Sequence, residues 1–314
     1  MWGVYPDLWV LALAVLLDLA VGELPARFHP TVWIGQTVAF AEKLAPKAGV
    51  RGLLAGALMA LLIPGLWAGA AYVAVQGLRE GVGSIAYILV GAVLLKSTFS
   101  VRMLHREAAQ VRNLLVRKGL DQARARLPSL VSRDVSRLTP EQATAAAVES
   151  VAENTTDSFV APWLAFALLG LPGAVAYRAI NTLDSMIGYH GKYEFLGKAS
   201  ARLDDLINLV PARLSALLLV ASSGLLPGQR ASNAWRIMWR DHARTESPNA
   251  GWTMSGMAGA LGVELEKVGH YRLGDRTRPL EPRDITRAIQ TMYLVGVQGL
   301  LIALGLIFLR GEVF

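Results

Sequence analysis

The sequence contains no cysteine among its 314 residues. This absence excludes disulfide bonds, thiolate nucleophiles and zinc or iron–sulfur centres held by cysteine. Charged residues are also scarce, at 18%, whereas hydrophobic residues make up 53% and the mean hydropathy is +0.39. Soluble domains usually carry about 25% charged residues, so this composition is typical of a protein that contacts lipid. The sequence shows neither a Walker A glycine loop nor a basic patch interleaved with aromatic residues, and we expect no nucleic-acid partner.

Long apolar stretches recur along the chain, and several approach the roughly 20 residues that a helix needs to cross a bilayer. We therefore expect an all-α, polytopic integral membrane protein with about five to six membrane helices, forming a single catalytic domain over residues 1–314. The expected spans are residues 9–21, 53–75, 82–95, 207–226 and 289–309. Two basic segments, 100–127 and 228–288, carry amphipathic helices that suit the cytoplasmic surface of the membrane.

The apolar stretch 159–180 is interrupted by Pro162 and by Leu171-Pro172-Gly173. Because proline and glycine break helices, two short helical pieces fit this stretch better than one uninterrupted span. If the pieces form a re-entrant hairpin, Asp157 and Asp184 at its ends return to the same side of the membrane. If they form a full span, the two residues lie on opposite faces. Broken helices inside a membrane are tolerated where they line a cavity, and we favour the hairpin or a kinked arrangement.

A polar stretch precedes this segment and repeats carboxylates every four residues, at Glu149, Glu153 and Asp157. A helix places all three on one face, where they repel one another unless a metal ion, an arginine, a bound cationic group or protonation compensates them. A solvated acidic face is the alternative interpretation. The neighbouring Asn154 and Ser158, and the apolar run that follows at once, favour a functional site.

A second polar stretch contains three pairs at helical spacing, namely Asn181/Asp184, Lys198/Arg202 and Asp204/Asn208. One helix would present the cationic pair and, about half a turn on, the last carboxylate–amide pair. This arrangement suits a phosphate held by Lys and Arg beside Mg²⁺ held by carboxylates. Salt bridges along the helix are the competing interpretation. The density of polar residues next to membrane spans favours the site.

Four motifs stand out in combination. They are Glu149-Ser-x-x-Glu153-Asn154-x-x-Asp157, Asn181-Thr-Leu-Asp184-Ser-Met186-Ile-Gly188-Tyr189, Gly197-Lys198-Ala-Ser-Ala-Arg202-Leu-Asp204-Asp205-x-x-Asn208-x-x-Pro211-Ala-Arg213 and Ser247-Pro248-Asn249-Ala-Gly251. Together they resemble the cobalamin-biosynthesis family CbiB/CobD, the adenosylcobinamide-phosphate synthases. The resemblance extends from Asp18 and His29-Pro30 to Tyr271. Two residues depart from the family pattern: His190 stands where a basic residue commonly follows Gly-Tyr, and Glu23 stands in a segment that often reads Gly-Asp-Pro.

The resemblance implies an enzyme, a carbon–nitrogen ligase of the cell inner membrane with its active site facing the cytoplasm. Such an enzyme joins the f side-chain carboxylate of adenosylcobyric acid to (R)-1-amino-2-propanol O-phosphate or to ethanolamine phosphate. It uses ATP and Mg²⁺ and forms an acyl phosphate. Its partners are the corrinoid and amino-alcohol phosphate substrates and the lipid bilayer. Both a homo-oligomer and a complex with later membrane enzymes of the pathway are compatible with the sequence.

Roles for individual residues follow from the resemblance as hypotheses. We expect Glu153, Asp157 and Asp184 to be catalytic. We expect Asp157, Asp204 and Asp205 to bind the metal ion. We expect substrate contacts from His29, Asn154, Asn181, Lys198, Arg202, Asn208, Arg213 and Asn249. The chemistry is compatible with these residue types, because phosphate transfer from ATP needs a metal ion and cationic side chains around the phosphates.

The sequence also allows two other functional classes besides the ligase. A membrane phosphotransferase with an aspartate-bridged dimetal site would suit Asp204, Asp205 and the Lys198/Arg202 pair. It would also need a second Asp-rich motif, and only Glu153/Asp157 has that spacing. A non-catalytic membrane sensor or accessory subunit of the same fold is expected to have lost the acidic cluster, which this sequence contains.

Overall fold

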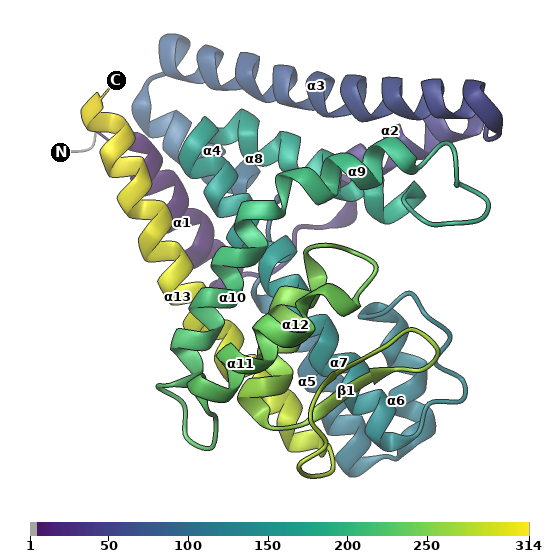
Figure 1. The fold of residues 1–314 in the computed structure, drawn as a ribbon. Coiled ribbons are helices and arrows are strands. Elements are labelled where there is room, and N and C mark those ends of the chain that lie inside the picture. Colours follow the sequence, from purple (N-terminus) through teal and green to yellow (C-terminus); the bar gives the residue numbers. More distant parts are fainter. Residues whose placement is uncertain (1–4, 314) are drawn as a thin grey trace. The chain divides into compact units, whose positions relative to one another are not determined.

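The computed structural model describes residues 5–313, which fold almost entirely as helices (Figure 1). The only strands in this part of the chain are β1 (Glu264–Lys267) and β2 (Tyr271–Gly274), an antiparallel hairpin in which Leu265 pairs with Leu273. The predicted all-α architecture is thereby confirmed. The hairpin was not predicted, because strands of four residues are too short to give a clear alternating pattern.

The chain forms two compact units. The first contains the described residues up to Ser100, the segment Ala161–Asn208 and the chain from Leu300 onward. The second contains Val101–Val160 and Leu209–Gly299. That the two units act as one catalytic domain stays a prediction.

The first unit is built from long apolar helices. They are α1 (Pro6–Ala20), the 3-10 turn η1 (Ala26–Phe28), α2 (Pro30–Leu44), α3 (Gly49–Gly81), α4 (Ser84–Lys96), α8 (Ala161–Ile187), α9 (Lys198–Ile207) and the end of α13 (Pro282–Val313). α3 lies along α8 and α9, and α1 packs against α4 (Figure 1). The core between α2, α3 and α8 contains the buried side chains of Val38, Met59, Ile63 and Leu183. Another face of α3 exposes leucines such as Leu58 and Leu61, as expected for a helix that contacts lipid.

The second unit carries both basic segments. Its helices are α5 (Arg102–Arg117), α6 (Leu120–Arg126), α7 (Pro140–Thr155), α10 (Leu209–Ser223), α11 (Ala231–Asp241), α12 (Ala250–Leu261) and the first part of α13, with the short turns η2 (Leu127–Ser129), η3 (Thr156–Val160) and η4 (His242–Arg244). α12 is buried from Gly251 to Leu261 and packs against α7, α10 and α11. α7 begins with a capping box between Thr139 and Gln142, which satisfies two backbone donors at its start.

Three helical stretches of the described chain are long and apolar enough to cross a membrane: Gly49–Gly81, Pro140–Ile187 and Pro282–Glu312. A fourth results if α9 and α10 are counted together as one bent span. This number is lower than the predicted five to six. The predicted spans at α1 and α4 have only 15 and 13 residues, fewer than the roughly 20 required, and the predicted segment 159–180 belongs to the longer stretch Pro140–Ile187. The membrane character of the chain is confirmed.

The stretch 159–180 is broken, as predicted. Gly170 within α8 has φ 67° and ψ −163°, a backbone conformation that is essentially restricted to glycine, and Pro172 follows it. A Cβ on Gly173 would lie 2.7 Å from the carbonyl oxygen of Ala165, eight residues earlier. The second helical piece therefore approaches the first closely at the break. Whether they form a re-entrant hairpin stays a prediction.

Candidate functional site

Asp204 on α9 is the centre of a hydrogen-bond network in the first unit. Asn208 donates Nδ2 to Asp204 Oδ2 at 3.0 Å, and Asn181 on α8 lies with its Nδ2 3.5 Å from Oδ1. Asn208 Oδ1 in turn accepts a hydrogen bond of 3.0 Å from the hydroxyl group of Tyr177. Two neutral amides thus orient the Asp204 carboxylate without cancelling its negative charge. The predicted pairing of Asp204 with Asn208 on one helical face is confirmed.

Arg178 fixes the orientation of Asn181, the second amide of this network. Its Nη1 donates to Asn181 Oδ1 at 3.1 Å, and its Nε donates to the carbonyl oxygen of Thr98 at 2.7 Å. Because the amide oxygen of Asn181 accepts from the guanidinium group, the NH₂ group of Asn181 is turned toward Asp204. Arg178 was not predicted. Its spacing of three residues from Asn181 was the one local signal, whereas its bond to Thr98 joins residues 80 positions apart.

The remaining predicted residues of α8 and α9 lie around this network. Asp184 is half-buried in the last turn of α8, and its Oδ1 occupies the space over Gly188, where a Cβ would fall 1.9 Å away. Asp205 is also half-buried and lies 3.9 Å from Arg202 Nη1. Lys198 is exposed, and the Arg202 side chain is 77% exposed. The cationic pair is therefore accessible to a ligand.

His29 belongs to another cluster of the first unit. Its Nε2 lies 2.9 Å from the Glu23 carboxylate, which also accepts a hydrogen bond of 3.0 Å from Lys96. Lys96 is only 2% exposed and lies 3.1 Å from the buried carboxylate of Asp18. Burial alone would raise the pKa of Glu23. Hydrogen bonds from His29 and Ser100 and the charge of Lys96 outweigh that effect and lower the pKa to about 2.

In the second unit an arginine compensates the first carboxylate of the acidic face of α7. Arg133 Nη2 lies 2.8 Å from the buried Glu149 carboxylate. Tyr271 on β2 lies near the same carboxylate and donates its hydroxyl group to Met254 Sδ at 3.7 Å, and burial together with the charges of Glu149 and Glu153 raises the pKa of its phenol. Neither Arg133 nor Tyr271 was predicted, because each lies far from Glu149 in the sequence and no spacing rule connects them.

The later residues of this face are half-buried. Asn154 donates Nδ2 to the Ser150 carbonyl oxygen at 2.9 Å and accepts a longer contact, 3.4 Å, from the Ser158 hydroxyl group. Asp157 lies in the π-helical turn that follows α7. Such a turn adds a residue to the helical repeat and is frequent at functional sites. Asp157 therefore no longer follows Glu153 at the α-helical spacing assumed from the sequence.

Arg213 and Asn249 are brought together although they lie on different helices. Arg213 on α10 donates Nη1 to Asn249 Oδ1, just before α12, at 2.9 Å. The guanidinium carbon lies 4.9 Å from the centre of the Trp252 ring, a cation–π contact. Two residues that were predicted separately as substrate contacts thus form one arrangement in the second unit.

Asp204 offers carboxylate oxygens, the type of ligand that a hard cation such as Mg²⁺ prefers. Among residues 5–313, no three His, Cys, Asp or Glu side chains gather closely enough to hold a metal ion with protein ligands alone. Mg²⁺ is, however, commonly bound by one or two carboxylates together with substrate phosphates. Asp204 offers a carboxylate whose orientation is already determined by amides. Metal binding by Asp157, Asp204 and Asp205 stays a prediction.

Comparison with known proteins gives consistent matches along the chain. The family described as CobD/Cbib protein matches residues 11–292. The cobalamin biosynthesis protein CobD of Dehalococcoides mccartyi (strain CBDB1) is 45% identical over 303 residues, covering 96% of this chain and 97% of that protein. The probable cobalamin biosynthesis protein CobD of Methanothermobacter thermautotrophicus is 39% identical over 297 residues, covering 94% and 96%. The cobalamin biosynthesis protein CbiB of Salmonella choleraesuis is 37% identical over 302 residues, covering 92% and 93%. No solved structure matches the chain.

Proposed function

Because the chain belongs to the CobD/CbiB family of cobalamin-biosynthesis proteins, we propose that it makes the amide bond of adenosylcobinamide phosphate. The substrates are adenosylcobyric acid, ATP and either (R)-1-amino-2-propanol O-phosphate or ethanolamine phosphate. The observation that carries this proposal is the family match over residues 11–292. The accessible cations and the oriented carboxylate of α9 support it.

The reaction divides into two balanced steps. In the first, the f side-chain carboxylate attacks the γ-phosphorus atom of ATP, so that an acyl phosphate forms and ADP leaves. In the second, the amino group of the amino-alcohol phosphate attacks the acyl carbon. The C–N bond forms, the C–O bond to phosphate breaks, and the nitrogen loses a proton to a base. Activation is required because an unactivated carboxylate would have to expel oxide.

Asp204 is the residue that we assign to the phosphate-transfer step. Asn181 and Asn208 hold its carboxylate in one orientation while leaving the charge intact, and Asp205 beside it offers a second carboxylate. A bound Mg²⁺ would supply charge neutralisation for the phosphate oxygens of ATP. Asn181 and Asn208 then act as positioning residues for Asp204 rather than as direct substrate contacts.

Anionic groups of the substrates are assigned to cations that the fold leaves accessible. Lys198 and Arg202 on α9 are exposed and four residues apart, so both reach the same side of that helix. Arg213, which stacks on Trp252 and bonds to Asn249, is a second candidate for phosphate. Each of these residues is proposed for ATP or for the amino-alcohol phosphate.

The proton of the attacking amine needs a carboxylate base. Glu153, Asp157 and Asp184 are half-buried, and each is a candidate. The π-helical turn at Asp157 and the position of Asp184 at the end of α8 place both near breaks in regular structure, where functional residues are common. His29, held by Glu23, is proposed as a weaker contact to the substrate.

An activity assay on the purified protein tests the proposed reaction. Purified protein is incubated with adenosylcobyric acid, aminopropanol phosphate, ATP and Mg²⁺, and products are followed by mass spectrometry. The proposal expects one ADP and one adenosylcobinamide phosphate per turnover. Turnover of ATP or alcohol phosphate without the corrinoid would indicate a phosphotransferase. Corrinoid binding without any product, by folded protein, would indicate a sensor.

We also propose that the protein lies in the cell inner membrane with its active site in the cytoplasm, where ATP is available. The basic segments favour that side for the second unit. A cysteine at the exposed Ser136, in a chain that has none, tests the orientation. It should react with an impermeant maleimide in inverted vesicles and stay unmodified in intact spheroplasts. The reverse pattern would refute the proposed topology.

A further inference from the structure

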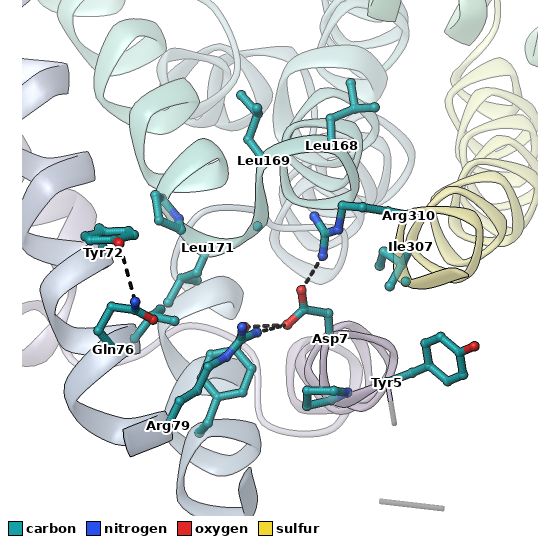
Figure 2. A pocket seen from close by; sticks show the side chains of 16 residues that line it. Tyr5, Asp7, Tyr72, Gln76, Arg79, Leu168, Leu169, Leu171, Ile307 and Arg310 are labelled. Carbon is teal, nitrogen blue, oxygen red and sulfur yellow. Dashed lines mark hydrogen bonds and ion pairs between the residues drawn. The ribbon is translucent and has the colours of Figure 1, made fainter. Parts of the chain in front are cut away.

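The first unit contains a polar cavity that shares no residue with the Asp204 network. Its volume is about 570 Å³, and it lies where the start of α1, the end of α3, the break in α8 and the end of α13 come together (Figure 2). Its polar lining includes Asp7, Gln76, Arg79 and Arg310. Its apolar lining includes the residues of the α8 break, Leu168 to Pro172.

Two arginines converge on one carboxylate in this cavity, as Figure 2 shows. Arg79 donates Nη2 to Asp7 Oδ1 at 2.8 Å, and Arg310 donates Nη2 to Asp7 Oδ2. The hydroxyl group of Tyr87 donates to Asp7 Oδ1 at 2.5 Å. Arg310 also donates Nη1 to the Ala167 carbonyl oxygen at 2.9 Å, which caps the first helical piece of α8. Among the lining residues, two guanidinium groups and one carboxylate leave one net positive charge, and the Glu312 carboxylate, which accepts from the hydroxyl group of Tyr5, lies outside the lining.

Arg79 retains donors for a ligand. A guanidinium group carries five N–H groups, and within the described chain Arg79 is seen to give one nitrogen to Asp7. Its side chain is 40% exposed, and its guanidinium carbon lies 4.1 Å from the centre of the Tyr87 ring, which limits its movement. Such a partly accessible, pre-oriented fork suits a phosphate group, which arginine binds through two parallel hydrogen bonds.

A second, apolar cavity adjoins the first. Its volume is about 490 Å³, and it is lined by Tyr5, Leu8, Trp9, Ala12, Leu304 and Phe308 of α1 and α13. Tyr5 lines both cavities, and its ring lies 5.3 Å from that of Phe308. Each volume falls within the roughly 300–1,000 Å³ of ordinary ligand sites. A cationic compartment and an apolar one thus share Tyr5 in their linings, and both are lined by α1 and α13.

We propose that the two cavities together bind one anionic glycerophospholipid. Its phosphate diester would lie against Arg79 and Arg310, and an acyl chain would run along Leu8, Trp9 and Phe308. The single net positive charge matches a headgroup of net charge −1, and the cavity lies at the ends of α3 and α13, where lipid headgroups are found. A free phosphate would leave the apolar cavity unexplained, and a zwitterionic lipid would leave the charge uncompensated.

The affinity for lipids can be measured by native mass spectrometry of the purified chain in detergent. The probes are phosphatidylglycerol, phosphatidylcholine and glycerol phosphate, which has the anion without the chains. We expect phosphatidylglycerol to bind about tenfold more tightly than phosphatidylcholine, since the quaternary ammonium group of choline adds a positive charge beside a lining that is already cationic. Glycerol phosphate should not bind measurably. Equal affinity for the two lipids, or glycerol phosphate binding as tightly as phosphatidylglycerol, would overturn the proposal.

Matched variants separate the charge from the apolar cavity. Arg79→Gln should weaken phosphatidylglycerol about tenfold and phosphatidylcholine much less, because for the second lipid the lost phosphate contact is offset by weaker repulsion of its ammonium group. Arg51→Gln, an exposed arginine at the other end of α3, is the control and should change neither. Leu304→Trp fills the apolar cavity and should weaken both lipids alike. Arg310 is left intact because it caps the break in α8. If Arg79→Gln binds lipid as Arg51→Gln does, the site is not the one proposed.

Discussion

Asp204 in the first unit and Glu149 in the second are both carboxylates on helices, yet their partners differ in charge. Asp204 accepts from the amides of Asn181 and Asn208, which are neutral. Glu149 is buried against the guanidinium group of Arg133 at 2.8 Å. Amides orient a carboxylate without adding a positive charge, so that a bound cation or a cationic substrate group can supply it. A carboxylate paired with arginine in a buried position is compensated already, and its role is to hold the structure.

The carboxylates on the acidic face of α7 also differ from one another in burial and in partners. Glu149 anchors the start of that face to Arg133, and its charge contributes to the raised pKa of Tyr271 on the β-hairpin. Glu153 and Asp157 lie farther along, are less buried, and stay the candidates for chemistry in the second unit. The comparison predicts that substitutions at Glu149 and Arg133 act on folding, whereas substitutions around Asp204 act on turnover.

The largest expected effect is on stability in the second unit. Arg133→Met removes the partner of a buried carboxylate, which should lower the free energy of unfolding by about 3–5 kcal/mol. Thermal unfolding in detergent measures the change. The double variant Arg133→Met/Glu149→Met removes both charges and should recover much of the loss. A single variant that melts like the wild type would show that Glu149 is not held by this arginine.

The next effect is on turnover in the first unit. Asp204→Asn keeps the shape of the side chain but removes its charge, and kcat for adenosylcobinamide phosphate should fall about a hundredfold or more. The melting temperature should stay close to that of the wild type. Glu149→Gln is the matched control in the second unit and should leave kcat near its normal value. Normal turnover by a folded Asp204→Asn protein would remove Asp204 from the site.

A smaller effect should follow from loosening the support of Asp204. Arg178→Lys keeps the positive charge but loses the fork that holds Asn181 and the Thr98 carbonyl oxygen. The Mg²⁺ concentration that gives half-maximal activity should rise about tenfold, and high Mg²⁺ should restore kcat. A merely structural role would lower stability and leave the Mg²⁺ dependence unchanged. Arg51→Lys, on the exposed part of α3, provides the comparison.

The smallest effect is a difference in pH dependence. Glu23 in the first unit has its pKa lowered from 4.5 to about 2, so its contribution to stability is present above pH 4.5 and is lost as the pH falls toward 2. The melting temperatures of the wild type and of Glu23→Gln should differ by a constant amount above about pH 5 and converge below it.

Tyr271 in the second unit provides the control for this measurement. Its pKa is raised, so its contribution is present below its ordinary value of 10 and is lost as the pH rises above 10. Tyr271→Phe should therefore show no convergence with the wild type on the acid side. A gap for Glu23→Gln that does not depend on pH would contradict the assignment of Glu23 to the cluster of His29 and Lys96.

Local spacing in the sequence was sufficient for several features of the site. The pairing of Asp204 with Asn208 depends on neighbours four residues apart, and the break in 159–180 depends on proline and glycine within the segment itself. Fewer helices have the length needed to span a membrane than the predicted five to six, because an apolar run shows that a segment avoids water but not how long its helix is. The first and third of these apolar runs form the helices α1 and α4, which have only 15 and 13 residues.

The sequence by itself determined that this is a helical membrane protein with two polar stretches at helical spacing, because composition and periodicity are local properties of the chain. Only the tertiary structure decided which side chain each carboxylate or arginine contacts. Arg178 reaches Thr98, Arg133 reaches Glu149, and Arg213 reaches Asn249 across separations that no repeat encodes. In a low-dielectric interior the sign of the partner decides whether a carboxylate is neutralised or left able to act, and that partner is supplied by folding.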